Sequence, residues 1–393
     1  MHSVGAGPSG PAGHRLLERR AMTARSLLPA VAATLAVVSM PCAASAQGRP
    51  FARLHLSIGQ GYDDNLFAAP ASGTTQSDFV TRFGPVVEGG YTSPTLSLLA
   101  RYGFDAERYV DRAELDKNLA RQDALIDIKY RPRPRLALSI DGGYLETQTP
   151  RELNVATLLP AGRARATRLR GHSGMVYDAD QVMKVSADYE LAQDDIAGSF
   201  VTTTNSARLG VAFRPTARTT IRSDYRLSHI AFGSDTTMYS VAVTGGIARV
   251  LTPSLTLEVD AGPRLSLGEV RPELAVQLRR RLRRGEVLIG YFATEDTAVG
   301  EIGAIQVQRL LGTLTLTPWK RVTVKVSPAT VRSVRASTPV RVHEIGGDVT
   351  IRANNTLSFV AVGHFGQQNG MFSGAADRIP YRGVSIKSVV TLQ

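Results

Sequence analysis

The chain has very little cysteine and no long apolar segment outside its first 46 residues. Its one cysteine, Cys42, lies in that first segment, so residues 47–393 contain no thiol and cannot form a disulfide framework. After residue 46 no run of 18 apolar residues occurs, which excludes a membrane-spanning helix on length. The seven histidines show no i, i+2 or i, i+4 pairing, so we expect neither a metal site nor a cofactor.

The first 46 residues have the composition of an export signal. Arginines precede an apolar run at 27–38, and Ala44-Ser45-Ala46 supplies the small residues that signal peptidase requires. Met22 is an alternative start. We therefore expect residues 1–46 to be removed and residues 47–393 to form a single exported domain with a net charge of about +9. This charge suits anionic lipid or an anionic solute, whereas export makes nucleic acid an unexpected partner.

Short clusters of turn-forming residues recur along the rest of the chain. Between them, apolar and polar residues alternate with a period of two, which is the signature of a β-strand. In the segment 96–106, for example, the even positions are apolar and the odd ones include Arg101 and Asp105. Eight clusters occur, at 92–94, 131–134, 178–180, 215–217, 252–253, 284–285, 318–320 and 354–355.

The length and polarity of these segments indicate a membrane barrel. They match the ~9–11 residues that cross a bilayer as a tilted strand, and each has one apolar and one ionic face. Eight tight turns join sixteen strands, and one further strand precedes and one follows them. The sequence thus predicts an all-β fold, a transmembrane antiparallel up-and-down β-barrel of eighteen strands. Sixteen remains the alternative because 265–272 and 327–339 are irregular.

The two ends of the predicted barrel differ. Tight turns would face the periplasm, and longer loops would lie outside the cell. These loops are expected at 63–77, 109–119, 148–164, 192–200, 295–300 and 368–381. Seven tyrosines, most of them on the apolar faces, fall at two distances from the tight turns, which predicts aromatic girdles at the two membrane interfaces. They are Tyr91, Tyr102, Tyr130, Tyr144, Tyr177, Tyr189 and Tyr225.

The polar faces of the strands would line the lumen. The arginine-rich run 279–284 lies at the tight-turn end, either as a basic vestibule that favours anions or as ordinary solvated lumen charge. The charged residues expected to line the pore are Arg101, Asp127, Lys129, Asp188, Arg222, Asp224, Arg226, Glu258, Asp260, Arg264, Arg279, Arg281 and Arg283.

The stretch Tyr62-Asp63-Asp64-Asn65-Leu66-Phe67 follows the first predicted strand. Its adjacent carboxylates do not have the alternate spacing of a calcium loop, so Asp and Asn are expected simply to begin the first outer loop. The stretch resembles a motif of the "porin 2" type of outer-membrane β-barrel porins, and residues 108–112 with Asn118 resemble that family's second loop. The resemblance implies a barrel with a transport role, some members being linked to export of extracellular polysaccharide, and it supplies no catalytic residue. Gln393 departs from the usual aromatic C-terminus.

The sequence offers little support for a catalytic activity. Gly171-His172-Ser173-Gly174-Met175 lacks the closing glycine of a nucleophile elbow and lies within a predicted strand, so we do not expect an enzyme. We predict an outer-membrane, porin-like channel of a Gram-negative bacterium for small hydrophilic, mildly anionic solutes. The alternatives are a barrel accessory to exopolysaccharide export and a plugged structural or adhesive barrel. Expected partners are outer-membrane lipid, the barrel-assembly machinery, and small solutes or polysaccharide; the oligomeric state is open.

Overall fold

Strands dominate the computed structural model, which describes residues 48–159, 162–233, 236–298, 300–335, 338–370 and 378–392. The export-signal prediction for residues 1–46 lies outside the described residues, as do Met22 and Gln393. The elements are β1 (Arg49–Asp63), β2 (Asp78–Thr92), β3 (Leu96–Tyr109), η1 (Ala113–Leu115), β4 (Lys117–Arg133), β5 (Leu136–Thr147), η2 (Pro150–Leu153), β6 (Ala166–Asp178), β7 (Met183–Ile196), β8 (Val201–Thr216), β9 (Thr219–Phe232), β10 (Thr236–Thr252), β11 (Leu255–Ser266), β12 (Glu269–Leu282), β13 (Gly285–Asp296), β14 (Ile305–Trp319), β15 (Val322–Arg335), β16 (Thr338–Arg352), β17 (Leu357–Asn369) and β18 (Arg378–Leu392).

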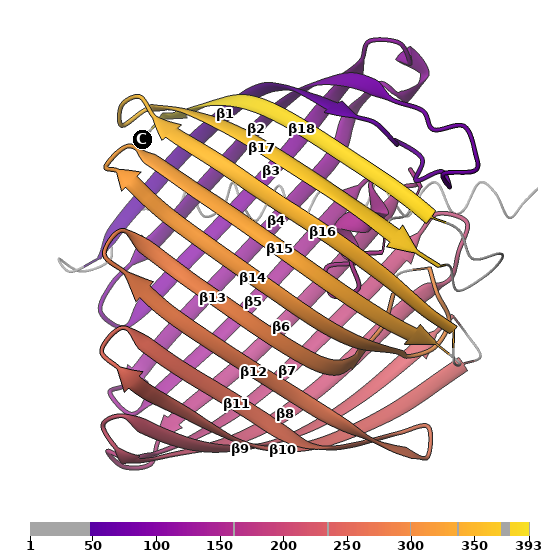
Figure 1. Ribbon diagram of the computed structural model, residues 1–393. Coiled ribbons are helices and arrows are strands. Elements are labelled where there is room, and N and C mark those ends of the chain that lie inside the picture. Colours follow the sequence, from indigo (N-terminus) through magenta and orange to yellow (C-terminus); the bar gives the residue numbers. More distant parts are fainter. Residues whose placement is uncertain are drawn as a thin grey trace, which may run out of the picture. The chain divides into compact units, whose positions relative to one another are not determined.

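The eighteen strands form one closed antiparallel barrel (Figure 1). Each strand pairs with its neighbours in the chain, and β1 pairs with both β2 and β18, which closes the sheet. The predicted fold class and the favoured strand count are therefore confirmed, and sixteen strands are excluded. Within the described ranges, no helix has both the length and the apolar character needed to cross a membrane.

All eight predicted tight turns occur, and local side-chain bonds form several of them. In the turn between β16 and β17, Asn354 Oδ1 accepts hydrogen bonds from the backbone N–H groups of Thr356 and Leu357, at 2.8 and 2.7 Å. Asp180 Oδ1 does the same between β6 and β7, at 2.7 Å to the N–H groups of Val182 and Met183. Such side-chain bonds replace the backbone partners that are lost where the chain reverses. We call this side of the barrel the tight-turn end.

The opposite side, the loop end, differs in detail from the prediction. The longer connections are 64–77, 110–116, 148–165, 197–200, 297–304 and 370–377, so the predicted 192–200 and 368–381 were too long. Three further connections there, 233–235, 267–268 and 336–337, are as short as the tight turns. The segment 265–272, whose sequence pattern is irregular, forms a hairpin whose turn residues, Leu267 and Gly268, have φ of 50° and 78°.

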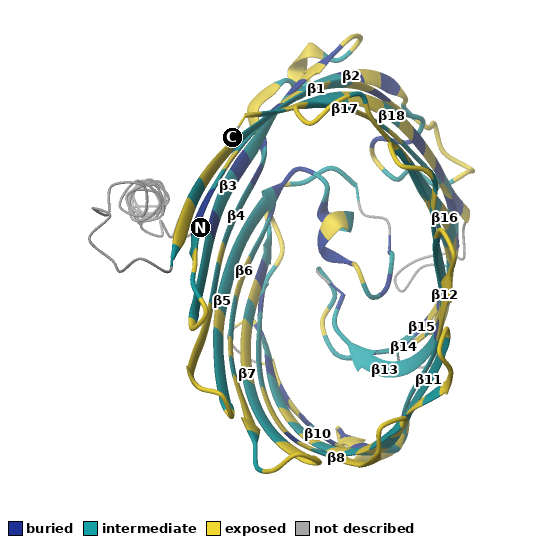
Figure 2. Cartoon of the chain, turned by 90° about the vertical axis from the view of Figure 1, so that its left-hand side faces the viewer, coloured by how far each residue is buried: buried dark blue, intermediate teal, exposed yellow. Residues whose placement is uncertain are grey.

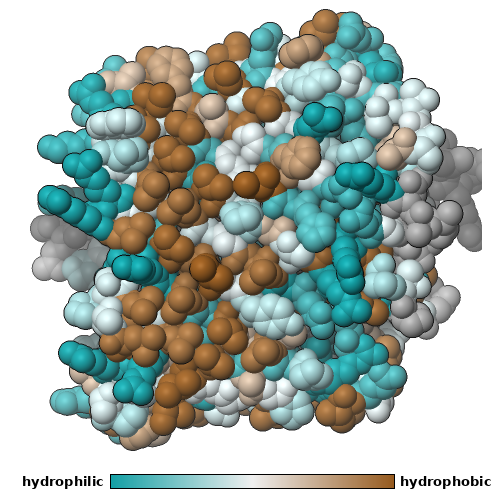
Figure 3. Space-filling model, in the orientation of Figure 1, coloured by the Kyte–Doolittle hydropathy of each residue, from teal (hydrophilic) through white to brown (hydrophobic). Residues whose placement is uncertain are grey.

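The register places alternate residues on an outward and an inward face. Apolar side chains such as Ile58, Leu209 and Ile386 are 58 to 61% exposed on the outward face. Figure 3 shows hydrophobic side chains spread over this outer surface, most densely toward the tight-turn end, with hydrophilic ones toward the loop end. A water-soluble sheet would cover such a surface.

The connection 148–165, which we call the inner loop, folds inside the ring of strands (Figure 2). Its Leu159 packs in a buried cluster with Ile305, Val331 and Val342, which lie on the inward faces of β14, β15 and β16. Leu153, in η2, packs against Ala166 at the start of β6. The largest apolar cluster among the described residues therefore forms where the inner loop covers one wall, and the wall from β6 to β12 is polar apart from a smaller cluster of Ile230, Phe232 and Met238.

Candidate functional site: the polar wall of the lumen

Two adjoining cavities lie along the inward face from β6 to β13. Their volumes are about 410 and 430 Å³, and both are lined by Glu190, Ser206, Arg226, Ala242 and Glu273. Strand alternation alone places these residues here, because every second side chain of β7 to β12 points inward. The shared lining makes the two cavities one polar tract along the wall.

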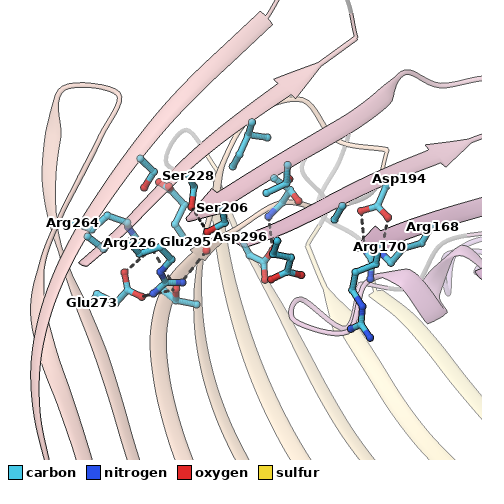
Figure 4. A pocket seen from close by; sticks show the side chains of 18 residues that line it. Arg168, Arg170, Asp194, Ser206, Arg226, Ser228, Arg264, Glu273, Glu295 and Asp296 are labelled. Carbon is cyan, nitrogen blue, oxygen red and sulfur yellow. Dashed lines mark hydrogen bonds and ion pairs between the residues drawn. The ribbon is translucent and has the colours of Figure 1, made fainter. Parts of the chain in front are cut away.

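Ion pairs organise the cavity nearer the loop end (Figure 4). Arg168 and Asp194 are cross-strand partners on β6 and β7, and Arg168 Nη2 donates to Asp194 Oδ2 at 2.8 Å in a two-bond contact. Glu273, on β12, forms ion pairs with Arg226 from β9 and with Arg264 from β11, the latter at 3.6 Å between Nη1 and Oε2. The side chains of Arg264 and Glu273 are only 5% and 10% exposed, so these charges depend on each other for solvation.

The second cavity, nearer the tight-turn end, carries a denser set of carboxylates. His172 contacts Asp141 at 2.8 Å through Nδ1 and Asp188 at 3.4 Å through Nε2. Arg222 forms two hydrogen bonds with Asp260 and one of 3.1 Å with Glu258. Among the described residues, no group of three or more His, Cys, Asp and Glu side chains has the arrangement of a metal site.

Two opposite charges on this wall have no partner. Within the part of the chain that the structure describes, the side chains of Arg170 and Glu190 form no hydrogen bond or ion pair, and both are exposed to the first cavity. Arg170 faces Ala192 across β6 and β7, one inward position from Glu190. Figure 4 shows Arg170 turned away from the Arg168–Asp194 pair. These groups can bind a charged or polar solute without first breaking an internal pair.

The inner loop is fastened to the wall at two points. Arg163 Nη2 donates to Glu107 Oε2 at 2.9 Å and its guanidinium lies 4.9 Å from the ring centre of Tyr109, both on β3. Arg151 forms an ion pair with Glu344 on β16 and stacks 3.9 Å over the ring of Tyr381 on β18. The two contacts, one on β3 and the other on β16 and β18, fix the loop inside the barrel.

Most of the pore-lining residues predicted from the sequence fall on the inward face. The register places Arg101, Asp127, Lys129, Asp188, Arg222, Asp224, Arg226, Glu258, Asp260, Arg264, Arg279 and Arg281 there. Arg283 is a correction, because β12 ends at Leu282 and Arg283 lies in the following turn. Whether these residues line a conducting pore stays a prediction. Arg168, Arg170, Asp194 and Glu273 were missed as site residues, although the alternation of β6, β7 and β12 could have indicated them.

The seven predicted girdle tyrosines all lie on the outward face. Three of them direct their hydroxyls to polar side chains: Tyr102 to Gln122 at 3.1 Å, Tyr144 to Glu146 at 2.7 Å, and Tyr189 to Asn205 at 2.8 Å. Arg165, in the loop before β6, also contacts Glu146, and these hydrogen bonds raise the pKa of its guanidinium, which therefore stays charged.

The stretch 62–65 ties the first loop to the last strand. Tyr62 and Asp63 end β1, so the loop proper begins at Asp64. Asp64 Oδ1 accepts from the Arg382 backbone N–H at 2.6 Å, and Asn65 Nδ2 donates to the Pro380 carbonyl at 2.8 Å. Asn65 also exchanges two hydrogen bonds with the Ala69 backbone. The expected role, beginning the loop, fits these contacts, and the same contacts reinforce the seam where the barrel closes.

No family model matches the chain, and no curated protein matches it. The chain is similar to solved structures of OpdO (13% identity, covering 87% of this chain and 97% of that one, TM-score 0.47) and OccK11 (14%, 87% and 96%, TM-score 0.45), both from Pseudomonas aeruginosa. It is also similar to a bacterial polysaccharide outer membrane secretin (13%, 87% and 99%, TM-score 0.37). These low values carry no functional argument, so the barrel rests on its own strand pairing and the "porin 2" resemblance stays a prediction.

Proposed function

We propose that the protein is a porin-like channel in the outer membrane of a Gram-negative bacterium, through which small hydrophilic solutes diffuse with a mild preference for anions. The proposal rests on the difference in polarity between the two faces of one closed sheet. Exposed apolar side chains cover the outside, which requires lipid, and a polar tract with unpaired Arg170 and Glu190 lies inside.

The anion preference is proposed to arise at the tight-turn end. Inward charges on the β6–β12 wall are largely paired, so that wall adds little net field. The basic side chains around the tight turns, by contrast, outnumber the acidic ones: Arg131, Arg133, Arg135, Arg214, Arg218, Arg283, Arg284, Lys320 and Arg321. A positive mouth raises the local concentration of anions and falls in effect as salt screens it.

Conductance of the purified protein in a planar bilayer under a salt gradient tests this function. Steady steps with an anion-biased reversal potential are expected. Replacing two unpaired inward arginines, Arg170→Gln with Arg281→Gln, should move the reversal potential toward zero. The matched control, Arg249→Gln with Arg280→Gln, changes two outward arginines and should leave it unchanged.

One observation favours a second candidate, the plugged structural barrel. The inner loop covers the inward faces of β14 to β16 and is fastened to β16 and to β3. Stable insertion without any conductance would therefore overturn the proposed diffusion channel and favour the plugged structural barrel. No comparable observation favours polysaccharide export or an enzyme, since Ser173 lies in the middle of β6 on its outward face.

A further inference from the structure

Two arginines meet on the outward face of the barrel near the loop end. Arg332 on β15 and Arg341 on β16 are direct cross-strand partners, and both are exposed. Arg332 has one side-chain contact, 3.4 Å to Gln308, and Arg341 has none among the described residues. Their chain neighbours Val331, Val340 and Val342 are buried on the inward face, which establishes the outward direction. Like charges directly opposite each other destabilise a sheet unless an anion lies between them.

An apolar groove begins on the same strands, on the tight-turn side of this pair. Its volume is about 540 Å³, and it is lined by Ile289, Leu310, Pro328, Ile345 and Phe365, together with Thr330, His343 and Gln367. The register runs from Pro328–Ile345 through Thr330–His343 to Arg332–Arg341, a distance of about 14 Å along the strand. Figure 3 shows the matching change from hydrophobic to hydrophilic side chains toward the loop end of this face. The surface is thus apolar toward the tight-turn end and cationic toward the loop end.

We propose that this surface binds one phosphorylated glycolipid of the outer leaflet, with an acyl chain in the groove and a phosphate between Arg332 and Arg341. Guanidinium groups bind phosphate through paired, charge-assisted hydrogen bonds. Burial of the exposed apolar lining under an acyl chain is favourable because it removes apolar surface from water. Gln308, Thr330 and His343 surround the pair and can hydrogen-bond to sugar hydroxyls. The inference rests on the proposed outer-membrane location, with the loop end facing outward.

The test is lipid binding to the delipidated, purified protein, measured by native mass spectrometry. The probe is lipid A, an acylated glycolipid with two phosphates, compared with its dephosphorylated form. In the variant Arg332→Gln with Arg341→Gln, we expect binding of lipid A to weaken by roughly tenfold or more, the loss expected for a charge-assisted contact. Binding of the dephosphorylated form should not change. Arg249→Gln with Arg280→Gln, at the tight-turn end, is the control and should bind as the unmodified protein does.

Three results would overturn the inference. The first is equal binding of both lipid forms by the unmodified protein, and the second is unchanged lipid A binding by the Arg332/Arg341 variant. The third is a change in the oligomeric state of this variant without a change in its lipid binding, which would make the groove a contact between copies of the chain. Phe365→Ala should weaken binding of both lipid forms, and an unchanged affinity would exclude the groove. Far-UV circular dichroism checks the folding of each variant. Conductance is recorded on the same samples. If the unmodified protein conducts but does not bind lipid A, this inference alone is rejected; if it binds lipid A but does not conduct, only the channel is rejected.

Discussion

Replacing Arg163 by glutamine should release one attachment of the inner loop. The Arg163 and Glu107 side chains are 10% and 9% exposed, and Glu107 also accepts from Arg82 at 2.9 Å and from the Tyr109 hydroxyl at 2.9 Å. Arg163→Gln keeps most of the side-chain length but removes the charge. Glu107 keeps Arg82 as a counter-ion, so the loss is that of the Arg163 ion pair and of its hydrogen bond to the Tyr109 hydroxyl, about 2 kcal/mol in all.

That magnitude predicts two separable measurements. The free energy of unfolding in urea should fall by about 2 kcal/mol, whereas Arg165→Gln, in the same loop, should cost less than about 1 kcal/mol because its pair with Glu146 is 46% exposed on the arginine side. A loss of about 2 kcal/mol also raises the detached population of the loop by roughly thirtyfold. In a planar bilayer the variant should therefore show larger current fluctuations than Arg165→Gln.

The reasoning would be refuted if the two variants had the same unfolding free energy and the same current noise. The link between this contact and the loop would be refuted if Arg163→Gln lost stability but showed no increase in current noise. In that case the contact stabilises the wall, and the loop is held by Arg151 and by the packing of Leu159 alone.

Three further changes probe the wall, the seam and a turn. Glu273→Gln removes the ion-pair partner of Arg226 and Arg264, so we expect a loss of about 2 kcal/mol in urea unfolding and a reversal potential shifted toward anions; an unshifted potential would mean that the solute path avoids this wall. Asn65→Ala removes three side-chain hydrogen bonds of a 6% exposed residue, so amide hydrogen exchange in 64–77 should accelerate strongly, with the exposed Asn118→Ala as the control. Leu267→Asn places a residue that tolerates positive φ in the turn and should stabilise the protein by up to about 1 kcal/mol; destabilisation would contradict the turn geometry.

The architecture could be predicted from the sequence because a barrel repeats one local rule. Period-two alternation assigns each residue to a face, and the turn clusters divide the chain, so strand count and inward residues such as Arg222 and Asp260 follow without any knowledge of long-range contacts. The rule failed where a local signal was atypical. Leu267-Gly268 is not one of the usual hairpin pairs, and Leu267 is 71% exposed at a positive φ, so the hairpin between β11 and β12 seemed irregular.

The inner loop and the partners of the inward charges could not be predicted in the same way, because they depend on curvature. Arg151 lies 193 residues from Glu344, and only closure of the sheet brings β16 opposite the loop that follows β5. The same closure allows Arg222 to reach over β10 to Asp260, since inward side chains of a curved wall converge while outward ones diverge. Convergence also explains why inward charges are mostly paired and why the outward Arg332 and Arg341 are not. On the outside, a counter-charge for adjacent arginines has to come from another molecule, and the lipid-binding test asks whether it does.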